Sequence, residues 1–103
     1  MKQQILRKLF LGFIQLHILY HAQKESVYGV FMIDELKSHG YDISAGTLYP
    51  ILNSLAAGGL LTKTNRLVGG KIRKYYRITT AGKKVLREAT AKAEELAREL
   101  RQS

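Results

Sequence analysis

The chain has 103 residues, of which 46% are apolar, and carries 17 Lys and Arg against 8 Asp and Glu, a formal net charge of +9. This length supports one small domain with a modest core, or half of a dimer. The absence of cysteine excludes disulfides and thiolate metal sites, and no segment is typical of export or of a membrane span. We therefore expect a cytoplasmic protein without membrane association.

The first predicted element is a long helix from Lys2 to Gln23. Its apolar residues recur at intervals of three and four, and additional ones widen the stripe, so the helix is expected to bury more than one side. They are Ile5, Leu6, Leu9, Phe10, Phe13, Ile14 and Ile18, joined by Leu11, Leu19 and Tyr20. A second helix is predicted from Tyr28 to His39, with Ser26 as its cap and Gly40 as its stop.

The third predicted helix lies in "ISAGTLYPILNSLAAGGLL", opens at Ser44 and ends at Gly58 and Gly59. Its apolar stripe has helical spacing: Leu48, Ile51, Leu52 and Leu55. Gly46 and Pro50 oppose a helix, by about 1 and about 3 kcal/mol in an interior position. The alternative is a late, irregular helix start capped by Thr47.

A β-hairpin and a last helix complete the order. "LLTKTNRLV" and "KIRKYYRIT" flank Gly69 and Gly70, which predicts two strands joined by a tight or slightly longer turn. In the second strand, alternation places Ile72, Lys74, Tyr76 and Ile78 on an inward face, and Lys71, Arg73, Tyr75 and Arg77 on a cationic face. Thr79 or Thr80 is expected to cap the last helix, which runs to about Arg101.

The positive charge is concentrated on the hairpin. Eight of the 17 basic residues fall between Leu60 and Lys84, where there is no Asp or Glu, whereas the rest of the chain holds nine basic and eight acidic residues. Such a local block is typical of a polyanion-binding face, because each Lys or Arg that meets a phosphate releases counterions. The alternative is an ordinary solvated surface.

Three helices followed by a basic hairpin form a winged helix-turn-helix, a mainly α fold with a small β-hairpin (α+β). We expect residues 1–79 to form this DNA-binding domain and residues 80–103 a dimerisation helix. With the apolar stripe of the third helix against the core, its other face meets solvent: Gly46, Thr47, Tyr49, Pro50, Asn53 and Ser54. Small, hydroxyl and amide groups of this kind suit a major groove, where Asn53 can pair with an adenine edge.

Three segments resemble, in order, the signature segments of the PadR family of transcriptional regulators. They are "VYGVFMIDEL", "ISAGTLYPILNSLAAGGLL" and "GGKIRKYYRITTAGKKVL", and the resemblance covers roughly Phe10 to Leu86. It implies a dimeric DNA-binding repressor whose wing, near Gly69 to Arg73, reaches a minor groove, and whose C-terminal helix pairs with a partner subunit. Several compact relatives stack flat ligands on a tryptophan of the last helix, which this chain lacks. An effector of unknown identity is left open.

The residues expected to contact double-stranded DNA come from the second helix, the third helix and the wing. Tyr28 is a candidate for either the core or a phosphate contact. The full set is Tyr28, Ser44, Gly46, Thr47, Tyr49, Pro50, Asn53, Lys71, Arg73, Lys74 and Tyr75.

The last helix has a heptad seam, which predicts a homodimer. Two of its five seam positions are alanines and it spans about two heptads, so we expect the first helix to share the interface. The expected interface residues are Leu9, Phe10, Phe13, Leu86, Ala89, Ala93, Leu96 and Leu100. The alternative is that the last helix folds back on its own domain.

Two histidines in the first predicted helix are the candidates for metal binding. His17 and His21 have a spacing that a metal could use, but no Asp, Glu or Cys is near them in sequence. We therefore expect partly buried, hydrogen-bonded histidines and no metal or cofactor; the alternative is a metal-ligand or pH-sensing role. No nucleophile and base pattern or phosphate loop is present, so no enzyme is expected. The remaining alternatives are a winged-helix protein-interaction module and a non-specific nucleic-acid binder.

Overall fold

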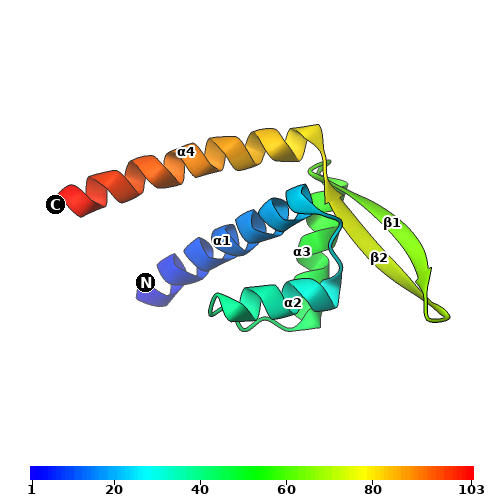
Figure 1. Ribbon diagram of the computed structural model, residues 1–103. Coiled ribbons are helices and arrows are strands. Elements are labelled where there is room, and N and C mark those ends of the chain that lie inside the picture. The colour runs from blue at the N-terminus through cyan, green and yellow to red at the C-terminus, as the bar shows by residue number, and fades with distance from the viewer.

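A computed structural model describes residues 1–103 as four helices and one antiparallel hairpin (Figure 1). In chain order these are α1 (Lys2–Lys24), α2 (Gly29–Ser38), α3 (Ala45–Ala57), β1 (Leu61–Val68), β2 (Lys71–Ile78) and α4 (Thr80–Gln102). α2 and α3 form the helix-turn-helix, and β1 and β2 form the wing. The expected fold class is therefore confirmed. None of the helices combines the length and apolar composition that crossing a bilayer requires.

One hydrophobic core joins α1, α2, α3 and the base of the wing. It contains 14 buried residues, among them the fully buried Ile18, Met32 and Tyr76. The predicted stripe of α3 enters this core: Leu48, Leu52 and Leu55 are buried, and Ile51 packs against them. Since full burial of an aliphatic side chain contributes about 1.5–3 kcal/mol, this stripe fixes which face of α3 meets solvent.

The start of α2 differs from the prediction. Its N-cap residue is Tyr28, without a side-chain cap, so the expectation that Ser26 caps this helix is wrong. The reason is a β-bridge: Val27 and Tyr76 exchange backbone hydrogen bonds of 2.9 and 2.7 Å. This bridge holds the chain extended at Val27, directly before the N-cap residue Tyr28. Ser26 precedes the bridge and is therefore not next to the first turn of α2. The predicted stop at Gly40 is confirmed by its φ of 89°.

α3 begins where Ser44 was predicted to cap it. The Ser44 hydroxyl accepts a hydrogen bond from the Thr47 backbone N–H at 3.3 Å, and the helix continues through Pro50. The late start with Thr47 as cap is therefore not observed. Pro50 has no N–H to give to the Gly46 carbonyl, and this missing bond falls in the first turns of the helix.

The wing has the predicted turn but only part of the predicted inward face. Gly69 and Gly70 have φ values of 57° and 80°, which a two-residue hairpin turn needs, and they join Val68 to its partner Lys71. Tyr76 and Ile78 are buried, but Ile72 is 70% exposed, so its expected inward packing is wrong. The tip of the wing projects beyond the helices (Figure 1), and the wing residues in the core, Leu61, Tyr76 and Ile78, all lie at its base.

α4 turns back alongside α1 in the opposite direction (Figure 1). Thr79 caps it as predicted: its hydroxyl accepts from the Gly82 N–H at 3.0 Å and donates to the Gly59 carbonyl at 2.6 Å. Gly82 is buried, and a Cβ there would collide with the Leu60 carbonyl. The first turn of α4 is thereby fixed to the end of the wing, while most of its length remains exposed.

Candidate nucleic-acid interface

The face of α3 that points away from the core is polar, small and free of acidic side chains. As predicted, its members are exposed: Gly46, Thr47, Tyr49, Pro50, Asn53 and Ser54. Hydroxyl and amide groups are the side-chain donors and acceptors that meet phosphates and base edges. The N-terminal end of the helix adds a positive dipole end beside Ser44.

Two arginines and two tyrosines stack on one another where the wing meets the start of α2. The Arg73 guanidinium lies 4.2 Å from the ring centre of Tyr28, and that of Arg66 lies 4.3 Å from the ring centre of Tyr75. The two tyrosine rings meet edge to face at 5.4 Å. We call these four residues the wing cluster. It brings together three predicted DNA contacts and adds Arg66, which the prediction did not include.

The wing cluster orients its cations without neutralising them. Stacking on an aromatic face favours one position of a guanidinium group, and it leaves the N–H donors free. Arg73 Nη1 also donates to the Tyr75 hydroxyl at 3.5 Å, and this hydrogen bond raises the pKa of Arg73 above its ordinary value. Arg73 is therefore held, fully charged, at the edge of the wing.

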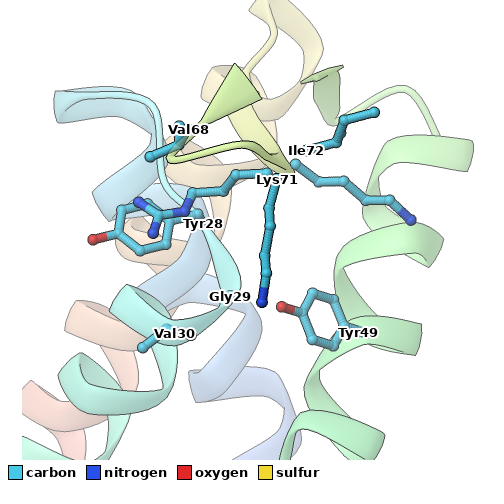
Figure 2. A pocket seen from close by; sticks show the side chains of 9 residues that line it. Tyr28, Gly29, Val30, Tyr49, Val68, Lys71 and Ile72 are labelled. Carbon is cyan, nitrogen blue, oxygen red and sulfur yellow. The ribbon is translucent and has the colours of Figure 1, made fainter. Parts of the chain in front are cut away.

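A hollow of ≈ 490 Å³ separates the wing from the helix-turn-helix. In Figure 2, Tyr28 and Tyr49 lie on opposite sides of Gly29, and Lys71 lies above them on the wing. The lining of the hollow comes from α2 with its N-cap residue, from α3 and from both strands of the wing: Tyr28, Gly29, Val30, Tyr49, Val68, Lys71, Ile72, Arg73 and Lys74. Five of these nine are predicted DNA contacts, so residues far apart in sequence form one surface here.

Tyr49 depends on Gly29 for its place on this surface. A Cβ built at Gly29 would overlap the Tyr49 hydroxyl and ring, so only glycine lets the ring lie against the start of α2. Gly29 was missed as a functional position, although the Tyr-Gly pair of the quoted segment marked it. This contact fixes the Tyr49 hydroxyl beside the hollow.

Asn53 also makes hydrogen bonds within the fold, which the sequence did not predict. Its Oδ1 atom accepts hydrogen bonds from the Tyr76 hydroxyl at 3.3 Å and from Lys63 Nζ at 3.4 Å. Tyr76 is fully buried, and burial raises the pKa of its hydroxyl. Because both groups of the amide are needed for a bidentate adenine contact, an engaged Oδ1 leaves only the Nδ2 donors free.

The cations of the wing have no acidic partners. The ion pairs of the chain join Glu35 to His21 and His39, and Lys92 to Glu95. None of these residues lies on the wing, so the positive charge predicted for the hairpin is uncompensated within the chain. This charge lies next to the exposed face of α3.

A second surface, apolar instead of cationic, runs between α1 and α4. It is a groove of ≈ 620 Å³, and it collects six of the eight predicted dimer residues: Leu9, Phe13, Ala89, Ala93, Leu96 and Leu100. Gly12 and Leu16 also line it and were missed. Phe10 and Leu86 are not among its lining residues. Phe10 instead packs edge-on against Tyr41 at 5.7 Å, and Leu86 packs against the core.

The histidines lie apart from both surfaces. His17 and His21 on α1 face His39 and Glu35 at the end of α2. The prediction considered His17 and His21 alone, because their two partners are more than a dozen residues away in sequence. The three histidines are the one group in the chain whose possible metal-ligand atoms all lie within 4.8 Å of one another.

Comparison with known proteins places most of the chain in one family. Residues 18–88 match the Transcriptional regulator PadR-like family. The chain is 48% identical to Transcriptional regulator Rv3488 of Mycobacterium tuberculosis over 87 residues, which cover 84% of this chain and 81% of the relative.

Two solved structures extend the likeness to the fold. A PadR family transcriptional regulator from Eggerthella lenta superposes with a TM-score of 0.82 and 35% identity over 95% of this chain and 87% of its own. A PadR-like transcriptional regulator (BC4206) from Bacillus cereus superposes with a TM-score of 0.82 and 29% identity, over 92% of this chain and 94% of its own.

Proposed function

Because the chain belongs to the PadR-like family of transcriptional regulators, we propose that it is a homodimeric repressor that binds a two-half-site operator in double-stranded DNA. It is a regulator and not an enzyme, as expected from its lack of catalytic motifs. DNA binding, dimerisation and repression are the parts of this function that we propose.

The observation that carries the proposal is the unpaired positive charge of the wing beside the acid-free face of α3. A major groove about 12 Å wide admits one helix, and α3 presents hydroxyl and amide groups to it. The wing would then lie over the adjoining phosphates or minor groove, where Lys71, Arg73 and Lys74 exchange counterions for contacts. Tyr28, Ser44 and Tyr75 would contact the backbone at the two ends of this surface.

Within α3, we propose that positioning and reading are divided. The Tyr49 hydroxyl lies at the edge of the hollow and is placed for a phosphate, whereas Gly46 permits close approach of the backbone. Asn53, one turn further, offers Nδ2 to a base while Oδ1 holds Tyr76. Thr47, Pro50 and Ser54 complete the face that would meet base edges.

The apolar groove between α1 and α4 supports a second copy of the chain as its occupant. Leu96 and Leu100 are 54% and 62% exposed, and Leu9 is 44% exposed, although all three line the same groove. Residues 80–103 would thus act as a dimerisation helix together with α1. A two-fold dimer places two copies of α3 on one side, which matches two half-sites about one helical turn apart.

The test measures the oligomeric state of the chain and its affinity for DNA. Sedimentation should give a dimer at micromolar concentration, and a duplex selected from a random library should bind at least about a thousandfold more tightly than unselected duplex at one salt concentration. Placing the selected site over a promoter should lower reporter output. A monomer, or equal affinity for both duplexes, would contradict the proposal.

A further inference from the structure

All three histidines of the chain meet at one place. His17 and His21 lie one turn apart on α1, and His39 is the C-cap residue of α2. Their ring nitrogens lie within 4.8 Å of one another, and the rings of His17 and His39 are stacked with centres 4.4 Å apart. Neither the proposed DNA surface nor the apolar groove includes any of the three.

A carboxylate lies beside two of the three histidines. Glu35 Oε2 lies 3.4 Å from His21 Nε2 and 3.8 Å from His39 Nε2. Glu35 and His39 are one turn apart on α2, just as His17 and His21 are on α1. Two helices therefore present two side chains each, facing one another across their contact.

We propose that His17, His21, Glu35 and His39 bind one divalent transition-metal ion of the zinc class. Imidazole nitrogen with carboxylate oxygen is a ligand set that Zn²⁺ and its neighbours accept, and carboxylate also suits their higher coordination numbers. Ligand atoms about 2.0–2.1 Å from a tetrahedral zinc lie about 3.3 Å apart. The histidine nitrogens, which lie within 4.8 Å of one another, must close by up to about 1.5 Å. The Glu35 carboxylate lies near His21 and His39 and must also turn toward the ion; the side chains of Glu35 and His39 are 33% and 46% exposed, which leaves them room to rotate.

The surroundings favour the neutral form of His17 and leave the cluster open to solvent. Burial, followed by the nearby His39 and His21, lowers the pKa of His17, so its nitrogen lone pair is free at neutral pH. The three histidines line a hollow of ≈ 490 Å³, whose wall also includes Phe13, Tyr20, Lys24 and Leu86. Water molecules there can fill the remaining coordination positions. The alternative is a plain ion pair in which Glu35 serves His21 and His39 and no metal enters.

An ion at this site would join α1 to the turn that leads into α3. Ser44, which caps α3, lies five positions after His39 in the sequence. α1, which carries His17 and His21, forms one wall of the apolar groove. Metal binding would thus set the angle between the DNA-reading helix and the proposed dimer face, as an effector does. This regulatory part rests on the proposed function, whereas the metal site itself does not.

The test uses the full chain without any added histidine tag. Titration with Zn²⁺ against a chromophoric chelator should give one ion per chain, and Co²⁺ should give visible absorption bands of a site with nitrogen and oxygen ligands. The double variant His17→Gln/His39→Gln should lose more than the about 10- to 100-fold in affinity that follows loss of an outer-shell partner. Glu35→Gln should weaken binding, and Asp34→Asn, an exposed neighbour on α2, is the matched control.

The outcomes separate the two parts of the proposal. No stoichiometric ion in the native chain, or unchanged affinity in the double variant, would overturn the metal site and leave an ion pair only. His39→Ala, at an exposed position, keeps the test decisive where the double variant fails to fold. Zn²⁺ should shift affinity for the selected duplex at least about fivefold in the native chain and not in the variant. An unchanged affinity with a bound ion would overturn the regulatory role alone.

Discussion

Asn53 shows how one side chain can serve the fold and the surface together. Tyr76 closes the core beneath the wing, and its ring is fully buried, so its hydroxyl needs a partner. Asn53 supplies that partner from the exposed face of α3 and also accepts from Lys63 on β1. The side chain therefore links α3 to the wing, and its loss is expected to affect stability as well as DNA recognition.

Replacing Asn53 with Ala should lower the free energy of unfolding by about 1–3 kcal/mol, because the Tyr76 hydroxyl is left without a partner. Urea denaturation would measure this. Adding Tyr76→Phe removes the hydroxyl that has lost its partner. The double variant should therefore lose less free energy of unfolding than the sum of the losses of the two single variants. Equal stability of Asn53→Ala and the native chain would show that the hydrogen bond contributes nothing.

Replacing Arg73 with Ala should weaken binding to selected and random duplexes alike. One lost phosphate contact should reduce the slope of log affinity against log salt by about one unit. Arg98→Ala removes the same charge from exposed α4, away from the proposed surface, and should leave the slope unchanged. If the two variants behave alike, net charge and not the wing governs the affinity.

At the scale of elements, two glycines at the starts of α2 and α3 differ in what surrounds them: one is closely packed and the other is exposed. Gly29 lies under the Tyr49 ring, where α2 and α3 approach closely. Gly46 is exposed in the first turn of α3, and a Cβ there would meet nothing nearer than Ser44 Oγ at 3.8 Å. The fold requires the first glycine, whereas the second lowers helix stability, and we propose that it allows the backbone to approach DNA closely.

Gly29→Ala and Gly46→Ala should therefore move stability in opposite directions. Gly29→Ala should destabilise the chain by about 1–3 kcal/mol through overpacking against Tyr49. Gly46→Ala should stabilise it by up to about 1 kcal/mol, since alanine is the better helix former, yet it should weaken binding to the selected duplex. Thermal melts and anisotropy titrations would check both. Unweakened binding by Gly46→Ala would remove the need for close backbone approach.

At the scale of the whole molecule, the single chain is extended. Its dimensions are 55 × 29 × 22 Å, and its radius of gyration of 14.9 Å exceeds the about 13 Å of a compact chain of 100 residues. Only 16 of 103 residues are buried, while leucines and phenylalanines of α1 and α4 remain exposed. An apolar surface of this kind is explained if a second copy covers it.

Replacing Leu96 with Glu should break the dimer, because it places a charge in the apolar groove between α1 and α4. We expect a monomeric or unfolded chain that no longer binds a site with two half-sites, measured by sedimentation and circular dichroism. Ala91→Glu puts the same charge on an exposed position of α4 outside the groove and should remain dimeric. A dimeric Leu96→Glu variant would place the interface elsewhere.

The sequence by itself determined the features that depend on near neighbours in the chain. The stripe of α3, the caps at Ser44 and Thr79 and the turn at Gly69 and Gly70 follow from helical spacing, from side chains bonding to N–H groups three residues on, and from a left-handed φ. The charge of the wing and the exposed face of α3 follow in the same way, so most of the candidate DNA surface could be named in advance.

Only the tertiary structure decided which distant residues meet. The bridge from Val27 to Tyr76 displaced the cap expected at Ser26, and the projecting wing left Ile72 without a core to pack against. The same holds for the remaining pairings: Gly29 with Tyr49, Asn53 with Tyr76, Phe10 with Tyr41, and His17 and His21 with Glu35 and His39. The physical reason is common to all of them, because spacing along a chain fixes the direction of a side chain within its element, whereas contact also needs the packing of a second element.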